Sequence, residues 1–572
     1  MDYKKSFSRW LDYFSQDKKM FSKLKNIESN EKELISGFSS ELQFGTAGLR
    51  GTMGMGTNKL NIYTVRRATQ GLVNYLVNKH QSTTIVISFD SRINSKLFAE
   101  ETASVIAANG IKAFITEQIS PTPFLSFAVR ELGCQAGIMI TASHNPAEYN
   151  GYKCYAEDGS QMTSADTRKV YEQIKRLDIF NDIKVSDFNL ELKKGMIEFI
   201  PHNTYEKYLQ KVLQQAINKE YPAKCKIKVT YTPLNGAGKN FVEKILYKSG
   251  IQDLDIVKEQ ASFDGNFSTC KYPNPEIEEV FELGLKSAKK NSSDIIIATD
   301  PDSDRLGVKV FHKGEYHMLN GNQIGILLFN YLISQKKEKN LLPKNPIAIR
   351  TLVSSKMVDS IAKNYNCQIW CVPTGFKNIG QKIFELEKSN SENSFLFGFE
   401  ESNGYLVGTY TRDKDAVSAS LLLCEMSSFY KEKNLTLIDV LNQLYEKYGF
   451  YMEKTISLEL NGPDANEKTV AIMEKLRTIG LFQSIGAKKI VSVKDYKNSC
   501  NLITGQRFRI NFENLDIIEF ELSDGSSIIV RPSGTEPKIK IYIMTSDKDK
   551  NLAKVNIDSM KSDFCSKIRE YI

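Results

Sequence analysis

Three acidic residues at alternate positions form the first candidate site in the sequence. The segment DPDSDR places Asp300, Asp302 and Asp304 directly after the apolar run IIIA. Alternate side chains of an extended segment point to the same side, so we expect the three carboxylates to converge. Converging oxygens without histidine or cysteine suit a hard cation such as Mg²⁺. The segment therefore predicts a metal site, with a solvated acidic turn as the alternative.

A serine follows a second apolar run, AGIMITA, in the loop SHNPAEYNGYK. A hydroxyl in the position of Ser143 could act as a nucleophile that carries a phosphoryl group. Lys153, ten residues further on, could act as an acid or base or as a phosphate clamp. His144 is one of only five histidines, which favours a functional role. Serine, asparagine, proline and glycine are also ordinary turn formers, so this loop alone is ambiguous.

Two further loops carry groups that bind anions. In RPSGTEPK, a guanidinium fork stands beside hydroxyls and closely approachable backbone N–H groups, a combination that suits phosphate; the residues concerned are Arg531, Ser533, Gly534 and Thr535. The alternative for this loop is a plain hairpin connection. Near the N-terminus, FGTAGLRG is rich in glycine and carries Arg50, but it lacks the pattern of a Walker loop.

These loops must be positioned by the elements that precede them. Short apolar runs typical of buried strands end at each polar loop, and helical stretches separate them, such as FAEETASVIAANG, which Gly110 closes. The predicted strands are 84–90, 136–142, 294–300, 393–400, 526–534 and 538–544. Because ligands collect outside the carboxyl ends of strands in open α/β sheets, we expect several domains to face one shared cleft.

Composition limits the class of protein. The chain has 572 residues, 41% of them hydrophobic and 25% charged, which is the range of ordinary globular proteins. The formal net charge of +8 comes without a dense basic block, so nucleic acid is not the expected partner. Nine cysteines without a pairing rhythm favour a reducing compartment. No apolar run is long enough to span a bilayer, so we expect a cytoplasmic protein that does not bind membranes.

At ~150 residues per domain the length predicts three or four domains. We expect an α/β protein with four domains around a central cleft. The first three contain mixed sheets with helices on both faces, and the fourth is a smaller α+β domain. The predicted units are 1–215, which bears Ser143 and an N-terminal helical extension, 216–322 for metal, 323–448 for sugar and 449–572 for phosphate.

Together the four loops resemble the α-D-phosphohexomutase family, which contains phosphoglucomutases and phosphomannomutases. The resemblance extends from FGTAGLRG (44–51) to RPSGTEP (531–537), almost the whole chain. FGTAGLRGTMGMGTNKLNIYTV and DKDAVSA place it nearest the branch of bacterial phosphoglucomutases and phosphopentomutase-type enzymes.

The resemblance implies roles for individual residues. Ser143 would be the phosphoserine, and one Mg²⁺ would bridge it to Asp300, Asp302 and Asp304. The remaining positions would bind or transfer the sugar phosphate; they are Arg50, His144, Lys153, Arg305, Thr374, Gly375, Lys377, Glu400, Ser402, Lys414, Arg531, Ser533, Gly534 and Thr535. Some relatives carry a histidine where this chain has Gly404, and Lys414 is expected to take its role.

The implied activity is that of a phosphoglucomutase, which interconverts glucose 1-phosphate and glucose 6-phosphate through phosphoserine and glucose 1,6-bisphosphate. Small sugar phosphates would be its partners, and the chain would be a monomer or a weak homodimer. Mannose or pentose phosphates are alternative substrates. Two other classes compete with this reading: a haloacid-dehalogenase-type phosphatase with Asp300 as nucleophile, and an inactive sugar-phosphate-binding scaffold.

Overall fold

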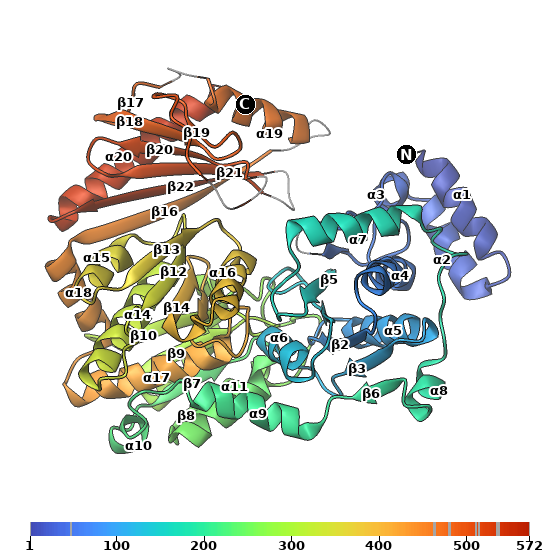
Figure 1. Ribbon diagram of the computed structural model, residues 1–572, viewed down its shortest axis with the longest axis horizontal. Helices are drawn as coiled ribbons and strands as arrows, with labels where there is room; N and C mark the ends of the chain where they lie inside the picture. Colours follow the sequence, from blue (N-terminus) through green and yellow to red (C-terminus); the bar gives the residue numbers. More distant parts are fainter. Residues whose placement is uncertain are drawn as a thin grey trace.

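The computed structural model describes residues 2–45, 48–460, 465–478, 482–509, 512, 515–533 and 538–570. Within these residues four β-sheets follow one another along the chain, each with its own helices (Figure 1). The expectation of a four-domain α/β protein is confirmed. Among the described helices, none combines the length and apolar character that a membrane crossing requires.

The first sheet has the strand order β1-β5-β4-β2-β3-β6. Strands β4, β2, β3 and β6 are parallel, whereas β5 and β1 are antiparallel to their neighbours. The strands are β1 (Leu49–Thr52), β2 (Thr84–Phe89), β3 (Lys112–Ile115), β4 (Ala136–Ile140), β5 (Tyr149–Ala156) and β6 (Ile197–Phe199). The helices of this part are α4 (Ile62–Lys79), α5 (Ser95–Ala108), α6 (Thr122–Glu131), α7 (Ser164–Arg176), α8 (Phe188–Lys193) and α9 (His202–Leu213).

Three helices precede this sheet and form a cap of their own, α1 (Tyr3–Tyr13), α2 (Lys18–Glu28) and α3 (Glu31–Phe38). Trp10 is almost fully buried among Phe7, Phe14 and Phe38. Aromatic side chains contribute large apolar areas, and edge-to-face pairs such as Trp10 on Phe38 add to the stability. The predicted helical extension is therefore a packed cap.

The second sheet has the order β11-β10-β9-β7-β8 and the third β13-β12-β14-β15. Their strands are β7 (Val229–Thr232), β8 (Leu254–Ile256), β9 (Ile295–Thr299), β10 (Leu306–His312), β11 (Glu315–Leu319), β12 (Ile347–Thr351), β13 (Gln368–Val372), β14 (Phe395–Glu400) and β15 (Gly404–Leu406). The helices are α10 (Tyr221–Lys224), α11 (Gly238–Ser249), α12 (Lys258–Ala261), α13 (Glu282–Asn291), α14 (Gly321–Glu338), α15 (Met357–Lys363), α16 (Phe376–Lys388), α17 (Ala416–Glu432) and α18 (Leu437–Tyr448).

Strand β9 shows why its sequence is apolar without alternation. Ile295 and Ile297 belong to one buried cluster, while Ile296 and Ala298 belong to another on the opposite face of the sheet. Successive side chains of a strand point to opposite faces, so a strand covered on both sides must be apolar at every position. The first of these clusters continues through side chains of the first and third units, and it holds the three units together as one packed body.

The fourth sheet is antiparallel, with the order β16-β22-β21-β20-β18-β17 and β19 paired to β18. Its strands are β16 (Phe450–Glu459), β17 (Ser484–Ile485), β18 (Lys488–Asp495), β19 (Cys500–Asn501), β20 (Ile518–Leu522), β21 (Ser527–Pro532) and β22 (Lys538–Asp547), and its helices are α19 (Ala465–Leu476) and α20 (Lys550–Arg569). These helices share a core with one face of the sheet. On the other face, Ile529 and Tyr542 pack with Val353 of the third unit.

A half-buried carboxylate at this junction makes stability depend on pH. Glu453 lies on β16, and burial raises its pKa to about 7. Hydrogen bonds with Ser355 and Asn322 favour the charged form and oppose this rise only in part. A carboxyl whose pKa is higher in the folded than in the unfolded chain costs stability as pH rises from about 4.5 to about 7. Glu453→Gln should therefore stabilise the protein at pH 8, by ~1 kcal/mol for a half-buried group.

The measurement is urea unfolding of both proteins at pH 4.5 and pH 8. The gain from Glu453→Gln should be present at pH 8 and nearly absent at pH 4.5. Glu459→Gln removes an exposed charge from the same strand and serves as the control. An equal gain at both pH values would contradict the assigned burial of Glu453.

Candidate active site

The three aspartates converge, but the segment that carries them is a turn. Ser303 has a φ of 51°, and its N–H donates to the Asp300 carbonyl at 2.9 Å. The Asp300 side chain caps the turn, because its Oδ1 accepts from the backbone N–H groups of Asp304 and Arg305 at 3.0 Å each. The expected extended conformation is therefore wrong. A carboxylate that accepts two local N–H groups stabilises a turn more than an extended strand.

The donor set fits a divalent cation. One oxygen from each of Asp300, Asp302 and Asp304 lies within 4.8 Å of the others, and all three residues are buried. Within the described part of the chain, Asp302 Oδ1 and Asp304 Oδ1 have no hydrogen-bond partner. Buried carboxylate oxygens without partners are costly unless a cation compensates them. An oxygen-only set of this kind suits Mg²⁺.

Ser143 reaches this cluster from the first unit. Its Oγ donates to Asp300 Oδ2 at 2.8 Å, and His144 Nδ1 lies 3.3 Å from Ser143 Oγ. The backbone of Ser143 has a φ of 53°, which is rare for serine, and its N–H donates to the Thr141 hydroxyl at 2.7 Å. Strained backbone of this kind clusters at functional sites. Burial, with Arg305 and Arg50 nearby, holds the pKa of His144 well below its usual value, so the imidazole is neutral near pH 7.

Two lysines oppose the negative charge of the aspartates. Lys153 Nζ donates to Asp302 Oδ2 at 2.8 Å, and Lys414 Nζ lies 3.1 Å from Asp304 Oδ2. Burial opposes the ionised form of Asp302, but Lys153 outweighs it and holds the carboxyl pKa below its usual value. Burial likewise opposes a charged Lys414, but Asp304 and Asp413 raise its pKa. Lys414 therefore remains charged beside the cluster.

A buried arginine, Arg92, forms hydrogen bonds with the backbone of the loop that bears Ser143. The Arg92 guanidinium donates to the backbone carbonyls of Ser143, Asn145, Pro146 and Tyr149, with distances of 2.5 Å to Asn145 and 2.8 Å to Pro146. Its side chain is fully buried and lies 3.4 Å from the equally buried carboxylate of Asp90. Because one rigid group binds four carbonyls, the position of Ser143 depends on Arg92.

The predicted sugar-binding residues meet at the end of β14. The N–H of Gly375 donates to Glu400 Oε1 at 2.8 Å, so the PTGFK segment and the ESNGY loop are in contact. Thr374 and Ser402 lie beside these two residues in the chain and are partly exposed. Lys377 Nζ donates to the Ser164 hydroxyl at 3.1 Å. Burial lowers the pKa of Lys377 and raises that of Glu400.

Glycine at position 404 is required by the path of Lys414. A Cβ at this position would lie 2.2 Å from Lys414 Cδ, closer than real Cβ contacts allow. The lysine side chain therefore occupies the space that any side chain at 404 would need. That Lys414 takes the role of the histidine that some relatives carry at position 404 stays a prediction.

The predicted arginines of the site have separate partners. Arg305 pairs with Glu276, and its Nε lies 3.9 Å from Asp304 Oδ1. Arg50 donates to the Asn145 side chain at 3.1 Å, in the loop that bears Ser143. In the fourth unit, Arg531 lies over the ring of Tyr542, 5.9 Å from its centroid. Ser533 follows β21, whereas Gly534 and Thr535 lie outside the described residues.

The sequence did not single out several residues that complete this site. Besides Arg92 and Asp90, the Thr122 hydroxyl donates to Asp302 at 2.8 Å, and Asp413 lies 3.5 Å from Lys414. Asp90 and Arg92 had a usable signal, because the run TIVISF ends in DSR just as the other strands end in polar loops. Thr122 lies in SPTPF, where nothing distinguishes it from an ordinary helix start.

Family models of known proteins match most of the chain. They are described as the α/β/α domains I, II and III and the C-terminal domain of phosphoglucomutase/phosphomannomutase, and they match residues 41–179, 206–313, 320–448 and 485–556.

Curated relatives and solved structures of the same family are also similar to this chain. The chain is 36% identical to a phosphoglucomutase of Staphylococcus saprophyticus, covering 93% of this chain and 94% of the relative. It is also 36% identical to a phosphoglucomutase of Staphylococcus aureus, and the match covers 90% of this chain and 92% of the relative. Parafusin (phosphoglucomutase) of Paramecium shares the fold with a TM-score of 0.67 at 18% identity over 93% of this chain and 96% of that one. A phosphoglucomutase/phosphomannomutase family protein of Burkholderia thailandensis also shares the fold, with a TM-score of 0.66 and 16% sequence identity; the match covers 93% of this chain and 98% of that one.

Proposed function

Because this chain belongs to the phosphoglucomutase/phosphomannomutase family, we propose that it is an enzyme that interconverts glucose 1-phosphate and glucose 6-phosphate. The curated relatives that cover nearly its whole length are named phosphoglucomutases. The observation that carries the proposal is the 2.8 Å contact between the Ser143 hydroxyl and Asp300, which joins a nucleophile of the first unit to the acidic cluster of the second.

In the proposed reaction, phosphorylated Ser143 donates its phosphoryl group to the 6-hydroxyl of glucose 1-phosphate. The bond between phosphorus and the serine oxygen breaks as the bond to the sugar oxygen forms, the 6-hydroxyl gives up its proton, and the released serine oxygen takes up a proton. Glucose 1,6-bisphosphate then turns over in the site and returns its 1-phosphoryl group to Ser143, so that glucose 6-phosphate leaves. His144, neutral and 3.3 Å from Ser143 Oγ, is positioned to accept the serine proton in this second half.

The remaining predicted residues are proposed to bind the substrate. Lys153, Lys414, Arg50 and Arg305 would neutralise the transferring phosphoryl group, since phosphoryl transfer depends chiefly on charge stabilisation and positioning. Sugar hydroxyls would be bound by Thr374, Gly375, Lys377, Glu400 and Ser402. The phosphate that does not react would be bound by Arg531, Ser533, Gly534 and Thr535.

Mg²⁺ is the proposed metal, with Asp300, Asp302, Asp304 and the phosphorylated Ser143 as its ligands. When bound, such an ion supplies positive charge to the phosphoryl oxygens. We further propose the domain division 1–215, 216–322, 323–448 and 449–572, a cytoplasmic location, and a monomer or weak homodimer that binds sugar phosphates and neither nucleic acid nor membranes.

The test of this function is an assay of the purified chain with glucose 1-phosphate, mannose 1-phosphate and ribose 1-phosphate, with and without glucose 1,6-bisphosphate. We expect the highest kcat/KM with glucose 1-phosphate and stimulation by the bisphosphate. A higher kcat/KM with mannose 1-phosphate or ribose 1-phosphate would show that this sugar phosphate, and not glucose 1-phosphate, is the preferred substrate. Release of inorganic phosphate without isomerisation would favour the phosphatase alternative.

The contacts of Arg92 lead to a further prediction. Lysine at this position keeps the charge but cannot bind four carbonyls at once. Because a displacement of about 1 Å of a reacting group costs roughly 100-fold in rate, Arg92→Lys should lower kcat by about that factor with little change in KM. Steady-state kinetics with glucose 1-phosphate measures this. Arg66→Lys, in a surface pair with Glu101, is the matched control; equal losses in both variants would contradict a positioning role.

A further inference from the structure

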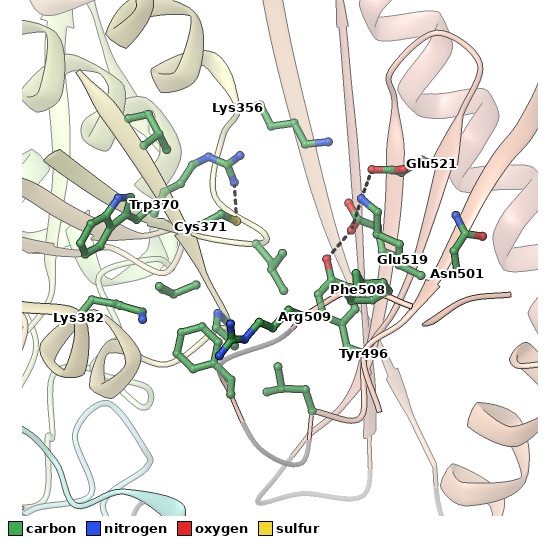
Figure 2. Close-up of a pocket in the computed structure, with 18 of the residues that line it drawn as sticks. Lys356, Trp370, Cys371, Lys382, Tyr496, Asn501, Phe508, Arg509, Glu519 and Glu521 are labelled. Carbon is green, nitrogen blue, oxygen red and sulfur yellow. Dashed lines mark hydrogen bonds and ion pairs between the residues drawn. The ribbon is translucent and has the colours of Figure 1, made fainter. Parts of the chain in front are cut away.

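Apart from the candidate active site, a cavity of about 880 Å³ lies between the third and the fourth units (Figure 2). One wall comes from β12 and β13, and the other from β18, β20 and the segment 501–509. Among the described residues, the cavity is lined by none of the aspartates, lysines or serines of the candidate active site. Its volume falls in the range of ~300–1,000 Å³ that is typical of small-molecule sites. It is therefore a separate candidate binding site.

Positive charge predominates in its lining. The cationic residues are Arg350, Lys356, Lys382, Lys494, Arg507 and Arg509, and the acidic ones are Glu385, Glu519 and Glu521. Six positive and three negative charges leave a formal excess of three positive charges. Clefts lined by one sign of charge concentrate ligands of the opposite sign. The cavity is therefore suited to an anion.

The acidic residues are already neutralised by their neighbours. Lys494 lies 2.5 Å from Glu521 and 3.8 Å from Glu519, and Lys382 lies 2.6 Å from Glu385. The Tyr496 hydroxyl also donates to Glu519 at 2.7 Å (Figure 2). These carboxylates therefore have little capacity left to attract a further cation.

Three further cations of the lining are Lys356, Arg507 and Arg509. Lys356 donates to the Ser527 hydroxyl at 3.3 Å. Within the ranges that the structure describes, no ion pair is formed by Lys356, Arg507 or Arg509, and both arginines are exposed. Like charges that line one cavity repel each other unless an anion joins them. These three side chains are the groups that a multiply charged ligand would contact.

Aromatic side chains line the same cavity from both units. Trp370 of β13 is partly exposed on one side, and Tyr496 and Phe508 form an edge-to-face pair at 5.5 Å on the other (Figure 2). Phe512 lies under Lys382, with 5.3 Å between Nζ and the ring centroid. Aromatic faces stack on planar rings such as nucleobases. The cavity thus offers surfaces for a flat ring as well as for an anion.

We propose that this cavity binds a nucleoside phosphate, with its phosphates at Lys356, Arg507 and Arg509 and its base on the aromatic side chains. A nucleoside triphosphate is the metabolite class that combines several negative charges with one planar ring. The ligand would contact both units at once, because Lys356 and Trp370 belong to the third unit and Arg509 to the fourth.

The experiment is isothermal titration calorimetry of the full chain with ATP, pyrophosphate and adenosine. We expect one ATP per chain, bound more tightly than either fragment, since both halves of the site contribute. Lys356→Ala and Arg509→Ala should each weaken ATP binding at least tenfold. Trp370→Ala should weaken ATP binding but leave pyrophosphate binding unchanged. Lys489→Ala removes an exposed cation of β18 outside the cavity and should have no effect.

Two further measurements separate this site from the candidate active site. Arg509→Ala should retain mutase activity while ATP binding is weakened at least tenfold, and Lys414→Ala should lose activity while ATP binding is retained. The proposal is overturned if millimolar ATP gives no binding heat, if Lys414→Ala abolishes ATP binding, or if Lys489→Ala weakens ATP binding as much as the cavity variants do.

Discussion

Replacing Ser143 by alanine is expected to lower kcat by about 10⁴-fold or more, since it removes the hydroxyl that contacts Asp300 and that is proposed to carry the phosphoryl group. The substitution removes one oxygen that donates to Asp300, and the strained turn keeps its backbone contacts with Thr141 and Arg92. The protein should therefore fold normally, with an unchanged circular dichroism spectrum.

The assay is isomerisation of glucose 1-phosphate in the presence of glucose 1,6-bisphosphate. Ser546→Ala, an exposed serine of β22, is the matched control and should keep full activity. Activity of Ser143→Ala within tenfold of the wild type would show that the phosphoryl group is not carried by this residue.

Asp302→Asn is expected to weaken Mg²⁺ binding by at least ~100-fold, because the variant loses one of three charged ligands and leaves Lys153 without its closest partner. The wild-type chain should gain thermal stability when Mg²⁺ is added after chelation, since a ligand that binds only the folded state stabilises it. Asp302→Asn should show little such gain and little activity.

Differential scanning calorimetry with and without Mg²⁺ measures the first effect, and the isomerisation assay measures the second. Asp294→Asn, at the other end of β9 and paired with Lys431, controls for the loss of one carboxylate. A Mg²⁺-dependent rise in melting temperature that survives in Asp302→Asn but not in Asp294→Asn would contradict the assigned metal site.

The strands were predictable because they are covered on both faces. Runs such as TIVISF and IIIAT are mostly apolar and lack polar alternation, and they form β2 and β9 with bounds that differ from the prediction by one residue at each end or less. The helix predicted at 98–110 begins at Ser95 instead, because Asn94 starts it without a side-chain cap that the sequence could reveal.

The candidate site was predictable where one loop carries its chemistry within a few residues. Asp300, Asp302 and Asp304 converge as expected, although through a turn capped by Asp300. Contacts between distant segments left no local pattern. Thr122 meets Asp302 across 180 residues of sequence, and the cavity at Trp370 exists only where two units meet. Such pairings depend on how the sheets pack, which periodicity and spacing do not specify.

The site of phosphorylation is the central claim, and its location can be measured directly. The chain is incubated with glucose 1,6-bisphosphate labelled in its phosphates, digested, and mapped by mass spectrometry. The label should appear as an acid-stable ester on Ser143 and should be discharged by unlabelled glucose 1-phosphate. A hydroxylamine-sensitive label on Asp300, or a label on any peptide without Ser143, would contradict the account.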